Sequence, residues 1–189
     1  MNAGGKSAVC AVAIYLVFVA GLGGSGPDHW QTRWRARLPT ARYVEQPDWD
    51  KPDVEAWARN VARACRESTR PLVLIAHSLG VTTLAHAVAQ LPDCNIKGAF
   101  LVAPPCDDVL AAGPLGPFAP TPHAKLRFPS ILVASRDDPY GPIAAAQELA
   151  RDWGAEFVDA GAAGPINAES GHGPWPEGLM SLARLLKQI

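Results

Sequence analysis

The sequence predicts an α/β protein with three layers, a mainly parallel sheet with helices on both faces. Short runs of branched apolar residues recur along the chain, helical patterns separate them, and the connections are rich in glycine and proline. Strands that are buried on both faces give such runs. The alternation of strands and helices implies right-handed crossovers between parallel strands.

Length and composition indicate one domain over residues 1–189, without a cap domain and with residues 1–7 as a leader. The chain is 48% hydrophobic and 19% charged, with a formal net charge of −1. No cluster of lysines or arginines indicates a nucleic-acid or membrane partner. No cofactor motif is present, so we expect no cofactor.

The cysteine pattern favours reduced thiols and a cytoplasmic location. The spacing fits neither a zinc motif nor a redox pair, so we expect no metal site. The four residues concerned are Cys10, Cys65, Cys94 and Cys106.

The apolar stretch at residues 8–20 admits two interpretations. Following Lys6, it resembles the apolar region of a signal peptide. The glycine-rich segment 21–26 directly after it is typical of a functional loop that ends a strand, and cleavage would discard that strand. We therefore favour a buried strand over residues 14–20.

The spacing of apolar residues and the positions of capping residues and prolines predict the remaining elements. A helix is expected over residues 28–38, with Asp28 as N-cap and with Trp30, Trp34 and Leu38 on one apolar face. A second helix begins after Asp53. Residues 106–128 show no period and contain four prolines, which indicates a loop or small lid. The other expected elements are strands at 41–44, 71–76, 98–103, 129–135 and 156–159, and helices at 81–91, 143–153 and 179–186.

Ser78 follows the most apolar strand and precedes a helix, which is the arrangement of a nucleophile elbow. Such a sharp turn requires small residues two positions before and after the serine, and Ala76 and Gly80 provide them. Alanine stands where this motif usually has glycine. The alternative is a serine that only caps the following helix.

A serine nucleophile requires a base and an acid, which follow it in the chain in this motif. Asp137 and Asp138 both follow the strand at 129–135, and we prefer Asp138 because it precedes a proline that turns the chain at the strand end. Asp137 would then solvate or cap the turn. Among the five histidines, only His172 lies after the last strand, and a base is expected there.

Backbone N–H groups can supply an oxyanion hole. The first helical residue after the serine, Leu79, offers one N–H. The glycine-rich loop at 21–26 offers a second, from Leu22 or Gly23, because glycine allows close approach of the backbone.

These segments together resemble the small serine hydrolases of the retinoblastoma-binding-protein type in the α/β-hydrolase superfamily. The segments that carry the resemblance are GGSGPDHWQ (23–31), QPDW (46–49), AHSLG (76–80), SRDDP (135–139), INAESG (166–171) and WPEG (175–178). The resemblance implies an α/β-hydrolase fold and serine hydrolase activity, with Ser78 as nucleophile and Asp138 as acid.

One departure from this family concerns the base. In the family, the catalytic histidine precedes the Ile-Asn pair, whereas Pro165 holds that position here. Two hypotheses follow. The chain is an esterase-like hydrolase of a small acyl substrate in which His172 acts as base, or it is a catalytically impaired binding protein. The sequence leaves the substrate and the oligomeric state open.

Overall fold

The computed structural model describes residues 13–91 and 94–189. Six parallel strands form one sheet in the order β2-β1-β3-β4-β5-β6. This confirms the three-layer α/β fold. The strands are β1 (Tyr15–Val19), β2 (Ala41–Tyr43), β3 (Leu72–His77), β4 (Ile96–Val102), β5 (Ser130–Ala134) and β6 (Glu156–Asp159).

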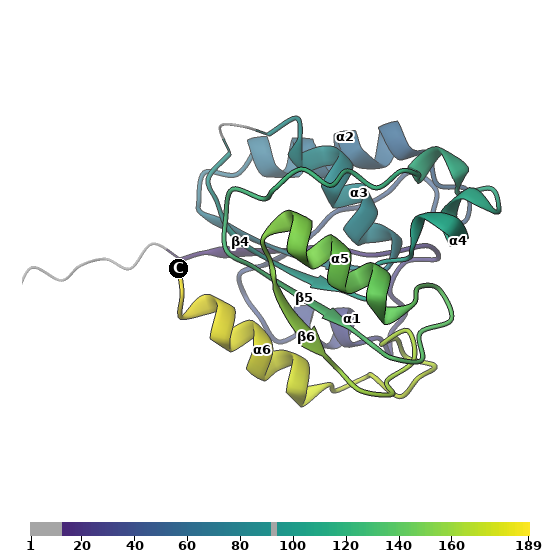
Figure 1. Cartoon of the computed structure of the whole chain (residues 1–189). Helices are drawn as coiled ribbons and strands as arrows, with labels where there is room; N and C mark the ends of the chain where they lie inside the picture. Colours follow the sequence, from purple (N-terminus) through teal and green to yellow (C-terminus); the bar gives the residue numbers. More distant parts are fainter. Residues whose placement is uncertain (1–12, 92–93) are drawn as a thin grey trace, which may run out of the picture.

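Helices cover both faces of the sheet, and Figure 1 shows α2 and α3 on one side and α6 on the other. Side chains alternate along each strand, so that Val17 and Val19 belong to the core on the side of α2, α3 and α5, while Leu16 and Phe18 belong to the core on the side of α1 and α6. The helices are α1 (Trp30–Arg35), α2 (Val54–Arg66), α3 (Leu79–Val88), α4 (Asp107–Ala111), α5 (Ile143–Trp153) and α6 (Pro176–Leu186).

The N-cap of α2 is the residue expected from the sequence, whereas the N-cap of α1 is a different one. Asp53 caps α2, since its carboxylate accepts a hydrogen bond from the Ala56 N–H at 2.7 Å. The cap of α1 is His29 instead of Asp28, because the His29 Nδ1 accepts the Gln31 N–H at 3.1 Å. The carboxylate of Asp28 pairs with Arg33 at 2.6 Å.

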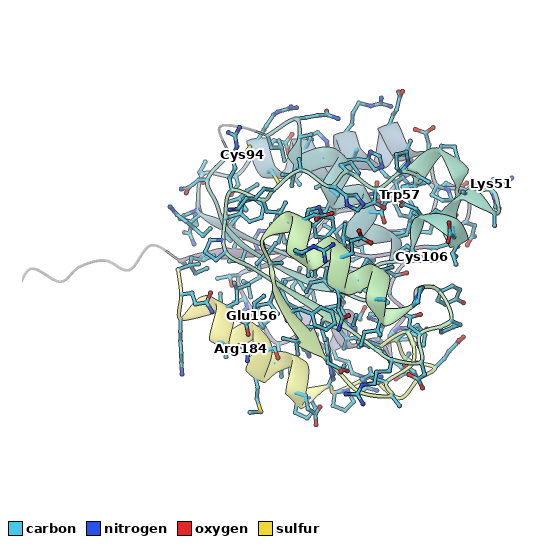
Figure 2. All side chains as sticks on the ribbon, viewed as in Figure 1. Lys51, Trp57, Cys94, Cys106, Glu156 and Arg184 are labelled. Atoms are coloured by element: carbon cyan, nitrogen blue, oxygen red, sulfur yellow. The ribbon has the colours of Figure 1, made fainter. Side chains whose placement is uncertain are left out.

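The stretch at residues 106–128 is more ordered than a plain loop. It contains α4 and a 3₁₀ turn at Gly116–Phe118, whose Phe118 is buried against Trp57 and Leu79. The last helix begins at Pro176, earlier than expected, because proline fits the first turn of a helix. Arg184 of α6 pairs with Glu156 of β6 at 2.8 Å, and Figure 2 labels both side chains.

The strand order places a site between β1 and β3. The chain leaves β1 toward β2 on one side and later returns to β3 on the other, so the crevice between β1 and β3 opens at their carboxyl ends. Ligand sites of open α/β sheets lie at such a reversal.

The expected leader lies outside the described residues. The helices of the described residues include none that is long and apolar enough to cross a membrane. Cys65, Cys94 and Cys106 are free thiols.

Candidate active site

Ser78 occupies a strained backbone conformation between β3 and α3. Its φ is 53° and its ψ is −130°, a combination that non-glycine residues rarely adopt. Its N–H donates to the Val102 carbonyl at 2.9 Å, while its side chain makes no capping hydrogen bond to α3. The geometry is that of an elbow that presents a side chain, and it does not support the alternative of a helix cap.

The elbow depends on two glycines that allow close approach of the backbone. A Cβ at Gly80 would lie 2.5 Å from the Val19 carbonyl oxygen. A Cβ at Gly21 would lie 2.9 Å from the Cβ of Ser78. The close approach at Gly80 confirms that the elbow requires a small residue two positions after Ser78. The structure also requires a small residue at Gly21, which was not expected from the sequence.

Two backbone N–H groups beside Ser78 are free to bind an oxyanion. The N–H groups of Leu22 and Leu79 have no hydrogen-bond acceptor within the described residues, and both residues line the cleft above Ser78. Gly23, expected as the alternative to Leu22, does not serve, because its N–H donates to the Trp49 carbonyl at 2.9 Å. Leu22 and Leu79 therefore remain the candidates for an oxyanion hole.

A buried glutamine holds this part of the site together. The Gln31 amide nitrogen donates to the carbonyls of Val19 at 3.3 Å and Ile75 at 3.2 Å, and so joins β1 to β3. Its amide oxygen accepts the Ser25 hydroxyl at 2.7 Å, which positions the glycine-rich loop. Gln31 was not expected from the sequence to have a role of its own at the site. The available signal is a polar residue between two core tryptophans.

A cleft of about 300 Å³ opens above Ser78. Five segments contribute to its walls: the glycine-rich loop, the elbow, the α4 segment, the loop after β5 and the loop after β6. Among its lining residues are His29, His77, Tyr140, Pro165 and Glu169. His172, the base expected from sequence, does not line this cleft.

The two imidazoles at the cleft are neutral near pH 7. Burial lowers the pKa of His29 to about 3 and the pKa of His77 to about 4, with smaller contributions from neighbouring histidines. The Nε2 of His77 lies 3.0 Å from the Pro165 carbonyl oxygen, so this nitrogen carries the proton and donates. His29 accepts at Nδ1, which places its proton on Nε2, a buried atom without a partner in the described part of the chain.

The two candidate acids have different surroundings. Asp137 is exposed and accepts hydrogen bonds from the Ser135 hydroxyl at 2.6 Å and the Gly164 N–H at 2.8 Å, and these bonds lower its pKa. Asp138 is half-buried, and burial raises its pKa although its carboxylate accepts the Tyr140 N–H at 2.9 Å. Asp137 thus connects β5 to the loop that carries Pro165, a role that the sequence analysis did not assign.

No imidazole nitrogen hydrogen-bonds the Ser78 hydroxyl in the described part of the chain. The Nδ1 of His172 lies 3.0 Å from the Ser170 hydroxyl, and its ring packs against Trp175. The structure therefore does not join His172 to Ser78 or Asp138. His86 and His123 hydrogen-bond elsewhere, to the Phe118 carbonyl and the Asp152 carboxylate.

Comparison with known proteins agrees with this geometry. The family described as "Serine hydrolase" matches residues 16–184. A YdeN-like hydrolase from Pectobacterium atrosepticum is 35% identical, with a TM-score of 0.81, and the match covers 91% of this chain and 90% of that one. No curated protein matches the chain.

More distant structures share the fold. The ydeN gene product of B. subtilis is 19% identical with a TM-score of 0.75, and the match covers 93% of this chain and 100% of that one. A monoacylglycerol lipase from Paleococcus ferrophilus is 12% identical with a TM-score of 0.71, over 93% of this chain and 95% of that one. The narrower resemblance to the retinoblastoma-binding-protein type stays a prediction. The family match over nearly the whole chain and the elbow at Ser78 agree: the chain belongs to the serine hydrolase family, within the α/β-hydrolase superfamily.

Proposed function

We propose that the chain hydrolyses carboxylic esters or amides through a covalent acyl-Ser78 intermediate. The observation that carries this proposal is the presence of the strained Ser78 and the free N–H groups of Leu22 and Leu79 in one cleft. A hydroxyl and two donors in this arrangement suit attack on a carbonyl group and stabilisation of the resulting oxyanion.

The reaction has two steps. The Ser78 oxygen forms a bond to the carbonyl carbon, and the carbonyl oxygen becomes an oxyanion to which Leu22 and Leu79 donate. The intermediate collapses, the bond to the leaving alcohol or amine breaks, and the proton of the serine passes to that group. Water then attacks the acyl carbon, releases the carboxylic acid and restores the serine.

The proton transfers require a base, and we propose His172, with Asp138 as its acid. His172 would have to exchange its hydrogen bond with Ser170 for one with Ser78. Gly164 and Gly171, with φ values of 56° and 86°, both precede His172 in the loop that would have to move. Glycine adopts other backbone angles more readily than any other residue.

A second function is favoured by Pro165. This residue lines the cleft at the position where the resembling family has its base, and proline cannot accept a proton. A chain in which no histidine replaces that base would keep the fold, the cleft and the oxyanion donors. It would then bind acyl compounds with little or no turnover.

A fluorophosphonate probe tests the nucleophile, because it reacts with activated serines. We expect the wild-type protein to gain one phosphonyl group at Ser78, identified by peptide mass spectrometry, and Ser78→Ala to gain none. Ser68→Ala is the matched control. Ser68 precedes β3, at the end of this strand away from Ser78, and its hydroxyl donates to the Arg70 carbonyl. Equal labelling of Ser78→Ala and the wild type would refute the proposal.

A further inference from the structure

The mouth of the cleft exposes apolar side chains around the nucleophile. Leu22 is 49% exposed, Val109 of α4 is 37% exposed and Tyr140 is 51% exposed, and all three line the cleft. Leu115, which follows α4, lines it as well. Large apolar side chains gathered at a concave site mark a binding surface. Val109 and Leu115 therefore make the α4 side of the cleft suitable for an apolar group of the substrate.

Another part of the cleft is charged, because Glu169 lines it. Glu169 is exposed and forms no ion pair with any residue that the structure describes. His29 and His77 are neutral near pH 7, because burial lowers their pKa values. Glu169 is therefore the one side chain of the described cleft lining that carries a charge at that pH.

The chemistry of serine hydrolases indicates which part of a substrate would meet Glu169, and this step rests on the proposed function. The base that takes the proton of the serine gives it to the leaving group, so its position adjoins the leaving-group side. By resemblance, Pro165 holds that position. Glu169 lies four residues further along the same loop and lines the same cleft. It would therefore face the leaving group.

We propose that the preferred substrates are esters of an apolar acyl group with a cationic alcohol, whose positive charge Glu169 recognises. The acyl group lies along Val109 and Leu115, and the alcohol lies toward Glu169. Cleavage transfers the acyl group to Ser78, and the alcohol leaves with the serine proton and its own charge unchanged.

Butyrylcholine and 3,3-dimethylbutyl butyrate form a matched pair of probes, because they have the same shape and differ in the charge of one group. Their affinities are measured by NMR titration of the Ser78→Ala protein, in which no acyl transfer to residue 78 occurs. We expect the choline ester to bind about two- to fivefold more tightly, the range for a solvent-exposed ion pair. Added salt reduces the difference because it screens exposed charges.

Two double variants test whether Glu169 causes the tighter binding of the choline ester. Ser78→Ala with Glu169→Gln should bind both esters equally. Ser78→Ala with Glu67→Gln should keep the preference, because Glu67 ends α2 next to the start of β3, at the opposite edge of the sheet. Equal binding by the Ser78→Ala protein, no binding of either ester, or a preference that persists without Glu169 would overturn the inference. Fluorophosphonate labelling of Ser78 would stand in each of these cases, so the two proposals fail separately.

Discussion

The Nε2 of His77 lies 3.0 Å from the carbonyl oxygen of Pro165. This hydrogen bond joins the residue directly before the nucleophile to the residue at which the resembling family has its base. The loop after β6 is therefore held at the cleft even though its proline cannot act as a base. Compared with the resembling family, the loop thus lies at the cleft with a proline in the position of the histidine base.

The buried imidazoles predict a stability that falls as the pH is lowered. The pKa values of His29 and His77 in the folded protein are about 3 and about 4, below the ordinary value of 6.5. Below pH 6.5 the unfolded chain binds protons that the folded chain does not, so stability is lost from that pH downward. Between pH 7 and pH 5, each imidazole should reduce the free energy of unfolding by about 2 kcal/mol.

Urea unfolding at several pH values measures this dependence. His29→Asn is the matched variant, since asparagine can also cap α1 but does not titrate. It should lose about half of the decrease between pH 7 and pH 5, whatever its absolute stability. The same pH dependence in wild type and variant would show that His29 is not held neutral by burial.

Gly80→Ala should disrupt the elbow. The added Cβ would lie 2.5 Å from the Val19 carbonyl oxygen, and a backbone atom cannot move away as a flexible side chain can. We expect the free energy of unfolding to fall by about 3 kcal/mol or more. Gly113→Ala is the control, because a Cβ there meets no atom within 4 Å. Denaturant unfolding that shows the same loss in both variants would contradict the close approach.

The two acids should separate in their kinetics. Asp138→Asn should lower kcat by about 10⁴, because an amide at the acid position holds the wrong tautomer of the base. Asp137→Asn should change kcat little, because its amide oxygen can still accept from the Ser135 hydroxyl and the Gly164 N–H. Steady-state kinetics with an ester substrate would reassign the acid if the opposite pattern appeared.

Two variants test the proposed base. His172→Ala should abolish ester hydrolysis, and Pro165→His should add little, if His172 leaves Ser170 to serve Ser78. The rate of p-nitrophenyl butyrate hydrolysis measures both variants. A silent His172→Ala together with a large rate increase in Pro165→His would contradict this assignment and favour the binding protein.

The sequence predicted most of the fold because its signals are local. All six strands were expected from the sequence, most of them from apolar runs, and the helix Ile143–Trp153 and the strand Glu156–Asp159 have the expected bounds. The five-residue helix α4 was missed, because one turn and a half among prolines shows no period. The cap of α1 was assigned to Asp28, although the adjacent His29 makes the hydrogen bond.

The site was less predictable, because several of its contacts join distant parts of the chain. No local pattern shows that Gln31 bridges Val19 and Ile75, or that Asp137 accepts from Gly164. Gly23 looked equivalent to Leu22 until its N–H was found on Trp49. Ser78 was predictable, because its elbow is set by the residues directly around it.

Intact-protein mass spectrometry after rapid acid quenching tests the acyl-Ser78 intermediate most directly. Mixed with excess p-nitrophenyl butyrate, the wild-type protein should gain the mass of one butyryl group, and peptide mapping should place that group on Ser78. The Ser78→Ala protein, in which Leu22 and Leu79 still offer their N–H groups, should gain none. An acyl group on another residue, or product release with no acylated protein at any quench time, would contradict the account.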